Sequence, residues 1–374
     1  MHIGVPKELK PQEYRVGLTP QSVQTLVTLG HTVWIESQAG QGIAVEDTAY
    51  LAAGAQVVQT AAEVFHQSRL IVKVKELQSS EYPLLREDHI LFAFLHLAPD
   101  VQQAQALIQS GCAAIAYETI QDATGRYPLL APMSAIAGRL AVQVGAHHLE
   151  RSQGGRGVLL GCVEGVPPGE VLVLGGGVVG SQAIEVAMGL GAHVTVLDVD
   201  SKQVSRLAQQ WGKALTAQVI TESNLSTMIV SADLVIGSIL VPGACTPKII
   251  QRSLLKKMLP KSVVVDVGID QGGCVETARP TTHASPTYEE EGVIHYCVPN
   301  MPGVVPRTST WALNHVVLPY VIQLADQGLA ALKADSGFKL GLNVDRGQVT
   351  CAPVAEALKV AYVSADQALS LRGI

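Results

Sequence analysis

The segment between residues 171 and 198 constrains the fold of this chain more than any other. A short apolar run, Val171–Leu174, is followed by a turn of the form G-x-G-x-x-G, a helical run, and a second apolar run that ends at Asp198. The three glycines of the turn are Gly175, Gly177 and Gly180. This order of strand, turn, helix, strand and terminal acid is typical of a βαβ unit that binds a dinucleotide.

The residues of this segment suit a dinucleotide for separate physical reasons. Gly175 would permit the tight turn, Gly177 would let backbone N–H groups approach a pyrophosphate, and Gly180 would let the helix lie close to the strands. The start of the helix supplies a partial positive charge. Asp198 would accept hydrogen bonds from the two adenosine-ribose hydroxyls and repel a 2′-phosphate, which predicts NAD rather than NADP. The alternative is an ordinary glycine-rich turn, and the complete βαβ context disfavours it.

Length and composition favour a two-domain α/β enzyme. The chain has 374 residues, more than a single core comfortably serves, and it is 48% hydrophobic and 16% charged. The net charge of -6 and the lack of a basic run argue against a nucleic-acid partner. No apolar run is long enough to span a bilayer, and the first residues lack the apolar core of a signal peptide, so we expect a cytoplasmic protein without a membrane partner.

Cysteine and histidine spacing predicts no metal site. The six cysteines are scattered without a C-x-x-C pair, which indicates buried thiols in a reducing compartment. His147 and His148 are adjacent and would point about 100° apart on a helix, and no third ligand joins them at a suitable spacing.

The order of expected elements predicts two doubly wound parallel-sheet domains separated by a cleft. In the N-terminal third, strand-like runs alternate with amphipathic segments, which is typical of a parallel sheet covered by helices. A helix is expected near Pro20–Leu29, and the expected strands are His2–Val5, Thr32–Glu36, Leu70–Val74, Ile90–Leu95 and Ala113–Tyr117.

The second domain is expected over residues 135–305, as a Rossmann NAD-binding domain. A long helix over Ala135–Arg151 precedes the glycine turn, and four further strands complete the six strands of such a domain. These are Gln218–Ile220, Asp233–Ile236, Val263–Val267 and Val293–Val298. Residues 306–374 are expected to form helices over Ala312–Leu324 and Val354–Leu369, joined by a glycine-rich segment, and to return to residues 1–134 as the substrate and catalytic domain.

Four polar residues follow expected strands at their carboxyl ends, where parallel α/β sheets bind ligands. Arg15 and Lys75 could clamp a carboxylate, with the arginine offering bidentate geometry. His96 could move a proton at the reacting carbon, and Asp270 could act as a second acid or base or hold a substrate amine. Because Asp270 belongs to the other domain, we expect it to face the first three across the cleft.

Each of these residues also has a structural interpretation. Lys73 and Lys75 could be solvated residues of an edge strand, and His96 could be a hydrogen-bonded histidine that closes a strand. Ser134 is suited to cap the helix that follows it, but a helix start can also bind phosphate. The occurrence of four such residues at equivalent positions favours a site for a small anionic acid.

At these residues the chain resembles the alanine dehydrogenase family, which shares its fold with the nicotinamide-binding part of proton-translocating transhydrogenase. The resemblance runs nearly end to end, and Pro132–Ser134 and Asp270–Cys274 are closer to alanine dehydrogenase than to transhydrogenase. The other segments that carry it are Gly4–Glu8, Glu13–Val16, Lys73–Glu76, Phe94–Leu97, Ala116–Thr119, Ala137–Arg139, Gly154–Val158 and Pro299–Pro302.

The resemblance implies an NAD-dependent enzyme that reversibly deaminates L-alanine to pyruvate and ammonium by hydride transfer to NAD, and that assembles as a homohexamer. It implies that Arg15 and Lys75 bind the substrate carboxylate and that His96 and Asp270 form the catalytic pair. A pocket built partly from Tyr117, Met133 and Met301 would take the substrate side chain. Besides the glycine turn and Asp198, the cofactor contacts that it implies are Ser134, Val178, Val179, Leu240, Ile269, Arg279, Val298, Asn300 and Met301.

Two departures from the family concern the adenosine side: Ile220 stands where relatives often carry serine, and Gln203 where a basic residue is common. Two other functions stay open. One is a hydride-transferring, nicotinamide-binding component of a transhydrogenase. The other is an NAD-binding regulator without enzymatic activity, in which His96 and Asp270 would be incidental.

Overall fold

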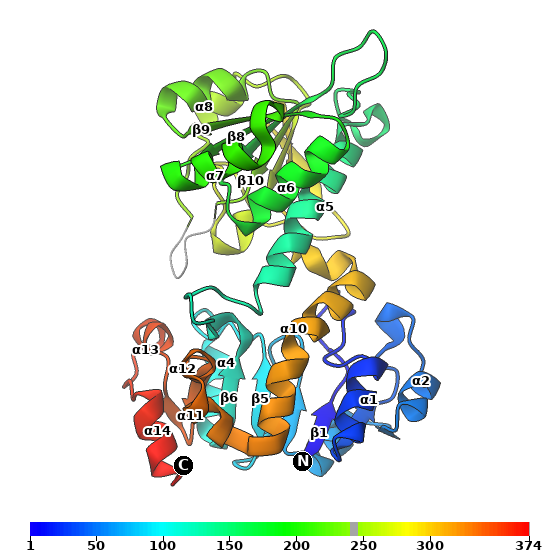
Figure 1. The fold of residues 1–374 in the computed structure, drawn as a ribbon, viewed down its shortest axis with the longest axis vertical. Helices are drawn as coiled ribbons and strands as arrows, with labels where there is room; N and C mark the ends of the chain where they lie inside the picture. The colour runs from blue at the N-terminus through cyan, green and yellow to red at the C-terminus, as the bar shows by residue number, and fades with distance from the viewer. Residues whose placement is uncertain (240–245, 374) are drawn as a thin grey trace. The chain divides into compact units, whose positions relative to one another are not determined.

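The computed structural model describes residues 1–239 and 246–373, and it divides into two compact units (Figure 1). Unit 1 comprises Met1–Met133 and Val305–Ile374, and unit 2 comprises Ser134–Val304. Both units are α/β structures built on a mostly parallel sheet, which confirms the predicted fold class. Helices cover both faces of a parallel sheet. Its strands are therefore short, continuous apolar runs whose residues are buried on both faces.

Unit 1 contains an eight-stranded sheet in the order β15-β14-β6-β5-β4-β1-β2-β3. The six strands from β6 to β3 are parallel, and β14 and β15 extend the β6 edge in antiparallel pairing. The strand order reverses between β1 and β4. The strands are β1 His2–Val5, β2 Thr32–Glu36, β3 Gln56–Val58, β4 Leu70–Val72, β5 Ile90–Ala93, β6 Ala113–Ala116, β14 Leu342–Asp345 and β15 Gln348–Val349.

Unit 2 contains a seven-stranded sheet in the order β12-β13-β11-β10-β7-β8-β9. The six expected strands are parallel and follow the Rossmann order, which reverses between β7 and β10. An additional strand, β12, pairs antiparallel with β13 at the edge. The strands are β7 Glu170–Leu174, β8 His193–Asp198, β9 Leu215–Val219, β10 Leu234–Gly237, β11 Val263–Asp266, β12 Thr287–Glu290 and β13 Val293–Tyr296.

Helices flank both sheets. In unit 1, α10 is drawn in orange in Figure 1 and contacts both β4 and α1, although it lies far from them in the sequence. None of the helices within the described residues combines the length and apolar character that a bilayer crossing needs. The helices are α1 Pro20–Thr28, α2 Asp47–Ala52, α3 Ala61–Gln67, α4 Val101–Ser110, α5 Ala131–Leu149, α6 Val178–Gly189, α7 Ser201–Trp211, α8 Glu222–Ile229, α9 Arg252–Leu255, α10 Pro306–Gln327, α11 Ala331–Ala334, α12 Ser336–Lys339, α13 Ala352–Leu358 and α14 Ala365–Leu371.

Several predicted segments differ from the structure. The helix expected over Ala312–Leu324 begins earlier, at Pro306, and the glycine-rich segment that follows it contains β14 and β15, which extend the sheet of unit 1. The helix expected after Ser134 begins earlier, at Ala131, so Ser134 lies in the first turn of α5 and is not its N-cap. Pro132 explains this start, because a proline lacks the N–H that a first turn leaves unpaired. The single helix expected over Val354–Leu369 is two helices, α13 and α14, because Lys359 adopts a left-handed conformation (φ 56°) that ends the first.

Candidate active site

The first candidate cluster lies where the strand order of unit 1 reverses, the position at which doubly wound sheets bind ligands. Glu8 lies beyond the carboxyl end of β1, and Lys73 directly follows β4, the neighbouring strand. The loop that contains Arg15 also follows β1. The topology of the sheet therefore brings together charged side chains from two segments that are about 60 residues apart.

Arg15 is almost fully buried and is held by a carboxylate from its own loop. Its Nε and Nη2 atoms donate to the two carboxylate oxygens of Glu13 at 2.7 and 2.6 Å, and its Nη1 lies 3.2 Å from the Sδ of Met133. Burial disfavours the Glu13 charge, but the hydrogen bonds and charge of Arg15 outweigh it and lower the pKa of Glu13. The guanidinium is thus fixed in one orientation by a bidentate ion pair.

Lys75 is a buried ammonium beside Arg15. Its pKa is lowered, first by burial and then by the positive charge of Arg15. Within the described residues the Lys75 side chain makes no ion pair or hydrogen bond, and its Nζ lies 5.8 Å from the ring centre of Phe94. The negative charges of Glu76 and Glu13 offset part of this lowering, but neither carboxylate pairs with Lys75 directly. A buried cation without a directly paired carboxylate is suited to bind an anion from solution.

Lys73 is a member of a buried ion cluster, although its alternation with Lys75 suggests a solvated residue. Its Nζ lies 2.9 Å from Glu81 and 3.3 Å from Glu8, and all three side chains are buried. The interpretation as a solvated edge strand is therefore wrong, because β4 lies inside the sheet between β1 and β5. Glu8 also accepts a hydrogen bond from the Val74 N–H at 2.6 Å, so this ion cluster holds the backbone next to Lys75.

His96 lies beyond the end of β5, with its backbone in the left-handed region (φ 48°). Its imidazole is parallel to the Phe94 ring, with the ring centres 5.9 Å apart and the planes inclined by 5°. Lys75 and His96 thus both lie close to the Phe94 ring, and Tyr117 packs against it edge-on. Tyr117 itself is fully buried, so in unit 1 it supports this aromatic ring instead of lining a surface pocket.

The loop that carries Arg15 is anchored to α10 by Asn314. The Asn314 Oδ1 accepts hydrogen bonds from the Thr19 N–H at 2.8 Å and the Ser22 hydroxyl at 2.9 Å, and its Nδ2 donates to the Gly17 carbonyl at 3.1 Å. Because Asn314 is buried, these hydrogen bonds are shielded from water and fix the loop.

The glycine turn of unit 2 leaves space where a pyrophosphate would lie. Gly175 has a positive φ of 94°, and a Cβ added at Gly177 would meet no atom within 4 Å. Helix α6 begins after Gly177, and no side chain caps it. An uncapped helix start beside open space suits an anion, so these residues fit the phosphates of a dinucleotide.

Gly180 makes the close approach between helix and strand. A Cβ at Gly180 would lie 1.8 Å from the Gly175 carbonyl oxygen. The adjacent strand end is held by Ser238, whose Oγ lies 2.8 Å from the carbonyl oxygens of both Leu174 and Gly175.

We expect Gly180→Ala to destabilise unit 2 by about 1–3 kcal/mol, because the added methyl group forces α6 away from β7. Gly189→Ala in the same helix is the control, since its added Cβ would meet nothing within 4 Å. Thermal unfolding followed by circular dichroism compares the two. Equal unfolding temperatures would contradict the packing role of Gly180.

Asp198 ends β8 and already supports the glycine turn. Its carboxylate accepts hydrogen bonds from the Gly176 N–H at 2.5 Å and from the Asp200 N–H at 2.8 Å. Gln203, the departure from the family pattern, donates from its side-chain amide to the Gly176 carbonyl and receives a hydrogen bond from Arg206 at 3.1 Å. An uncharged residue therefore stabilises the turn at this position, and Arg206 brings a positive charge next to it. Ile220 packs against the core of unit 2.

Asp270 lies exposed in the 3-10 helix Val267–Gln271 that follows β11, and its Oδ2 accepts a hydrogen bond from the Asn300 N–H at 3.4 Å. Asp266 fixes the segment that follows this 3-10 helix. It accepts hydrogen bonds from the Cys274 and Val275 N–H groups at 2.8 and 3.2 Å, and burial raises its pKa to about 6.

The remaining predicted cofactor residues of unit 2 differ in exposure. Val178 is exposed at the start of α6, whereas Val179, Ile269, Val298 and Met301 are buried. The Arg279 guanidinium lies 4.0 Å from the ring centre of Tyr288. Leu240 lies outside the described residues.

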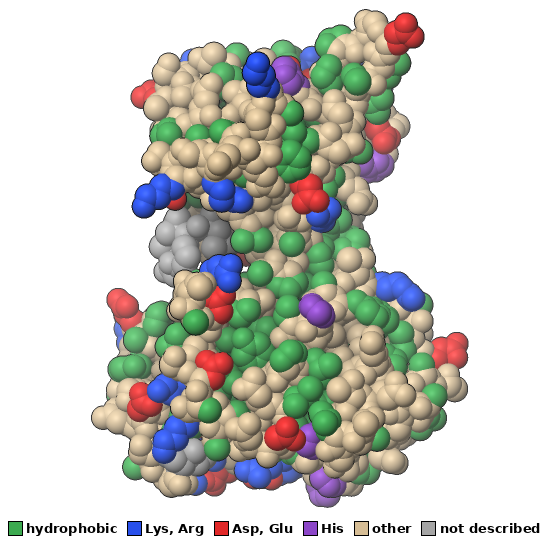
Figure 2. Space-filling view, viewed as in Figure 1, with side chains coloured by type: hydrophobic (Ala, Val, Ile, Leu, Met, Phe, Trp, Pro, Cys, Tyr) green, Lys and Arg blue, Asp and Glu red, His purple; other side chains and the backbone are tan. Residues whose placement is uncertain are grey.

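Metal-ligand groupings, cysteines and surface charge do not indicate a further site among the described residues. They contain no group of three His, Cys, Asp or Glu side chains placed to hold a metal ion. Of the five cysteines described, Cys162 is exposed, contrary to the expected burial, because it lies in the loop that precedes β7. On the face drawn in Figure 2, Lys and Arg side chains are interspersed with Asp and Glu, so their charge does not single out a nucleic-acid surface.

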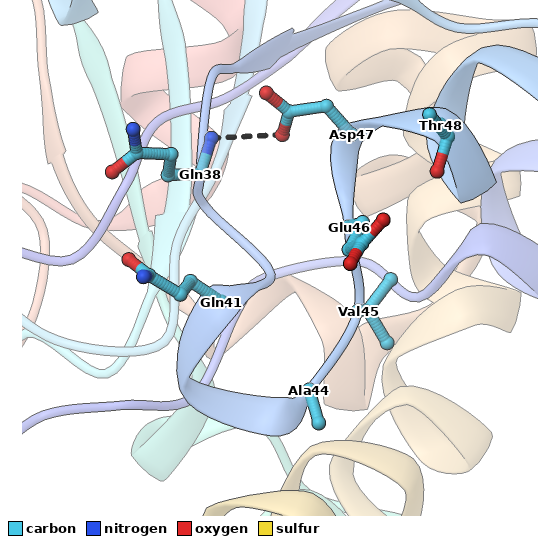
Figure 3. Close-up of a pocket in the computed structure, with 7 residues that line it drawn as sticks. All are labelled: Gln38, Gln41, Ala44, Val45, Glu46, Asp47 and Thr48. Atoms are coloured by element: carbon cyan, nitrogen blue, oxygen red, sulfur yellow. Dashed lines mark hydrogen bonds between the residues drawn. The ribbon is translucent and has the colours of Figure 1, made fainter.

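Unit 1 also has a cavity of about 530 Å³ that none of the predicted site residues lines (Figure 3). Asp47 accepts a hydrogen bond there from the Gln38 N–H at 2.8 Å. Its lining contains two carboxylates and no Lys or Arg, so it does not suit an anionic substrate. The lining residues are Gln38, Gln41, Ala44, Val45, Glu46, Asp47 and Thr48.

Unit 1 thus brings Arg15 and Lys75 together and connects them to His96 through Phe94, whereas unit 2 holds the glycine turn, Asp198 and Asp270. Sequence reasoning missed Glu13 and Phe94, although both lie inside segments that carry the family resemblance. Their proximity to Arg15, Lys75 and His96 in the sequence is the signal that could have identified them.

Known proteins match the chain over almost its whole length. Residues 4–137 match the family domain described as "Alanine dehydrogenase/PNT, N-terminal domain", and residues 141–352 match the corresponding C-terminal domain. An alanine dehydrogenase from Methanococcus maripaludis is 48% identical over 99% of this chain and 100% of its own length.

Solved structures give the same result. An L-alanine dehydrogenase is 50% identical, with a TM-score of 0.94 over 96% of this chain and 99% of that chain. A transhydrogenase from Sinorhizobium meliloti is 26% identical, with a TM-score of 0.82 over 93% of this chain and 100% of that one. With both of its domains matched and near-half identity to full-length relatives, the chain belongs to the alanine dehydrogenase/PNT family.

Proposed function

We propose that this protein is an NAD-dependent alanine dehydrogenase, which reversibly deaminates L-alanine to pyruvate and ammonium. The observation that carries the proposal is the buried ammonium of Lys75, which pairs directly with no carboxylate among the described residues, beside the fixed guanidinium of Arg15. Two such cations are suited to hold the carboxylate that alanine and pyruvate share. The near-half identity to alanine dehydrogenases supports the same conclusion.

The cofactor proposed is NAD, held by the glycine turn of unit 2. The uncapped start of α6 and the open space at Gly177 suit the pyrophosphate, and the carboxylate of Asp198 suits ribose hydroxyls and opposes a 2′-phosphate. The further contacts in the proposal are Ser134, Val178, Val179, Leu240, Ile269, Arg279, Val298, Asn300 and Met301. When bound, NAD supplies the acceptor for the hydride that leaves the substrate Cα.

The residues of the chain bind the substrate and move protons. Lys75 and Arg15 hold the carboxylate. His96 and Asp270 take protons from the substrate amine and from the water that adds to the substrate imine, and they return them in the reverse reaction. Both side chains are exposed at strand ends, where a substrate can reach them. Residues 1–134 with 306–374 form the substrate and catalytic domain in this proposal, and residues 135–305 bind NAD.

An absorbance assay for NADH formation with a panel of amino acids tests the proposal, and alanine is expected to give the highest rate. The second candidate is a transhydrogenase component, which the structural similarity to a transhydrogenase supports. Turnover of alanine by the isolated chain excludes that candidate. Turnover with serine, glycine or lysine but not alanine would overturn the substrate assignment.

We expect Asp198→Ala to lower the preference for NAD over NADP by roughly 10- to 100-fold, the range for a charged hydrogen bond. The ratio of kcat/KM values for NAD and NADP measures this. Asp200→Ala is the matched control, because Asp200 caps α7 through the Lys202 N–H at 2.9 Å and should leave the ratio unchanged. Equal use of both cofactors by the unaltered enzyme would refute the role of Asp198.

The proposal includes a homohexamer, which the resemblance to the family implies, and a cytoplasmic location. Three exposed apolar side chains, Leu159, Val163 and Val166, precede β7 and would be stabilised by burial in an assembly. Light scattering from the purified protein measures the oligomeric state.

A further inference from the structure

Glu118 makes three backbone hydrogen bonds at one point of unit 1. It lies in the 3-10 helix Tyr117–Thr119, which follows β6. One carboxylate oxygen, Oε1, accepts from the His96 N–H at 2.6 Å, and both oxygens lie 3.2 Å from the Leu95 N–H. Because β5 and β6 are adjacent parallel strands, residues that follow each strand lie side by side.

These hydrogen bonds hold His96 in a conformation that it would not readily adopt by itself. The positive φ of His96 is sterically unfavourable for a residue with a side chain. Hydrogen bonds to a charged acceptor are stronger than neutral ones, so the carboxylate can stabilise this geometry. On the other side of the same peptide, Gln103 donates to the Leu95 carbonyl at 2.9 Å. The backbone that leads into His96 is therefore held from both sides.

The same carboxylate lies close to the imidazole. The Nδ1 of His96 is 3.9 Å from the Oε1 of Glu118, whereas the imidazole is still half exposed. The left-handed backbone directs the side chain outward, and Phe94 lies parallel to its ring. Glu118 thus determines where the imidazole lies and places a negative charge beside it.

We infer that Glu118 is a positioning residue for His96, and that it acts on the reaction only through His96. This inference rests on the proposed function, in which His96 transfers protons. Loss of Glu118 would let the backbone of residues 95 and 96 relax and move the imidazole away from the substrate. A displacement of about 1 Å in a catalytic group can slow a reaction by about 100-fold.

A double-mutant cycle tests the inference. The variants are His96→Ala, Glu118→Ala and the double replacement, and the rate of NADH formation in a single turnover is measured with alanine and NAD. We expect His96→Ala to slow the reaction by roughly 100- to 10,000-fold, the usual range for a general acid or base. Glu118→Ala is expected to slow it by roughly 10- to 100-fold with little change in the KM for alanine. The double variant should be as slow as His96→Ala alone.

Two further variants guard against a failure to fold. Glu118→Gln keeps an acceptor oxygen and loses the charge, so its rate should lie between those of the unaltered enzyme and Glu118→Ala. Glu63→Ala is the matched control, because Glu63 also accepts hydrogen bonds from two backbone N–H groups of unit 1, those of Gln59 and Thr60. It should leave the rate unchanged.

The outcomes separate the inference from the proposed function. If His96→Ala is slow but the losses from the two replacements multiply in the double variant, Glu118 does not act through His96 and the inference is overturned alone. An unchanged rate for Glu118→Ala overturns it as well. A normal rate for His96→Ala would contradict the role of His96 in the proposed reaction and would overturn the inference about Glu118 as well.

Discussion

Replacing Lys75 with methionine is expected to raise the dissociation constant of pyruvate by roughly 100- to 1,000-fold, the effect of removing one partner from a buried charge pair. Methionine keeps the length of the side chain and removes the charge that the substrate carboxylate would neutralise. Arg15 would remain, but Glu13 already holds two of its donors. Titration of the enzyme and NADH with pyruvate, without ammonium and followed by NADH fluorescence, gives the constant.

The pH dependence of the same titration follows from the pKa of Lys75. Burial and Arg15 lower this pKa below the ordinary lysine value of 10.5, so the ammonium loses its proton earlier as the pH rises. Pyruvate binding should therefore weaken on the alkaline side below pH 10.5, and Lys75→Met should bind weakly at every pH without this change. Lys339→Met is the control, because Lys339 pairs with Asp366 at 2.6 Å elsewhere in unit 1. Unchanged pyruvate affinity in Lys75→Met would contradict its proposed role.

Replacing Lys73 with methionine is expected to destabilise unit 1 by about 3–5 kcal/mol, because it leaves two buried carboxylates without their cation. Burial already raises the pKa of Glu8 to about 7, even with Lys73 in place. Burial opposes the charge of Lys73 too, but Glu8 and Glu81 outweigh it and raise its pKa, so the cluster depends on mutual neutralisation.

The sign of the pH effect follows from linkage. Without Lys73, the pKa of Glu8 rises further above its value in the unfolded chain, so the protonated form of Glu8 favours folding and this stability is lost as the pH rises through the folded value. The difference in unfolding free energy between Lys73→Met and the unaltered protein should be larger at pH 8 than at pH 5. Urea denaturation at both pH values measures it. A difference below about 1 kcal/mol at pH 8, the range of a surface pair, would contradict the burial of this cluster.

The sequence allowed candidate polar residues at strand ends to be predicted, because the carboxyl end of a strand can be located from a few neighbouring residues. An apolar run followed by a polar residue marks a carboxyl end, and Lys75, His96 and Asp270 were predicted in this way, as was Arg15 in the loop after the first strand. The glycine turn was identified because its spacing reflects backbone geometry within one βαβ unit. Gly175 indeed has a positive φ, and Gly180 packs against the Gly175 carbonyl.

The properties that depend on neighbouring segments could not be predicted. The alternation of Lys73 and Lys75 shows that both point to one side, but only the position of β4 inside the sheet shows that this side is buried. Glu118 lies 22 residues from His96, and only the pairing of β5 with β6 places them together. The start of α5 was misplaced because Ser134 is a favourable cap in isolation, although Pro132 indicates an earlier start.

The anchoring of the Arg15 loop by Asn314 has a consequence for how the protein is made. Asn314 follows Gly17 by 297 residues, and β14, which pairs with β6, comes later still. While the chain emerges from the ribosome, unit 2 is continuous in sequence and can complete its fold first. Unit 1 has to wait for the last 70 residues or so before its sheet and its substrate loop are supported. A nascent chain can therefore acquire its dinucleotide turn well before it gains a structured place for the carboxylate.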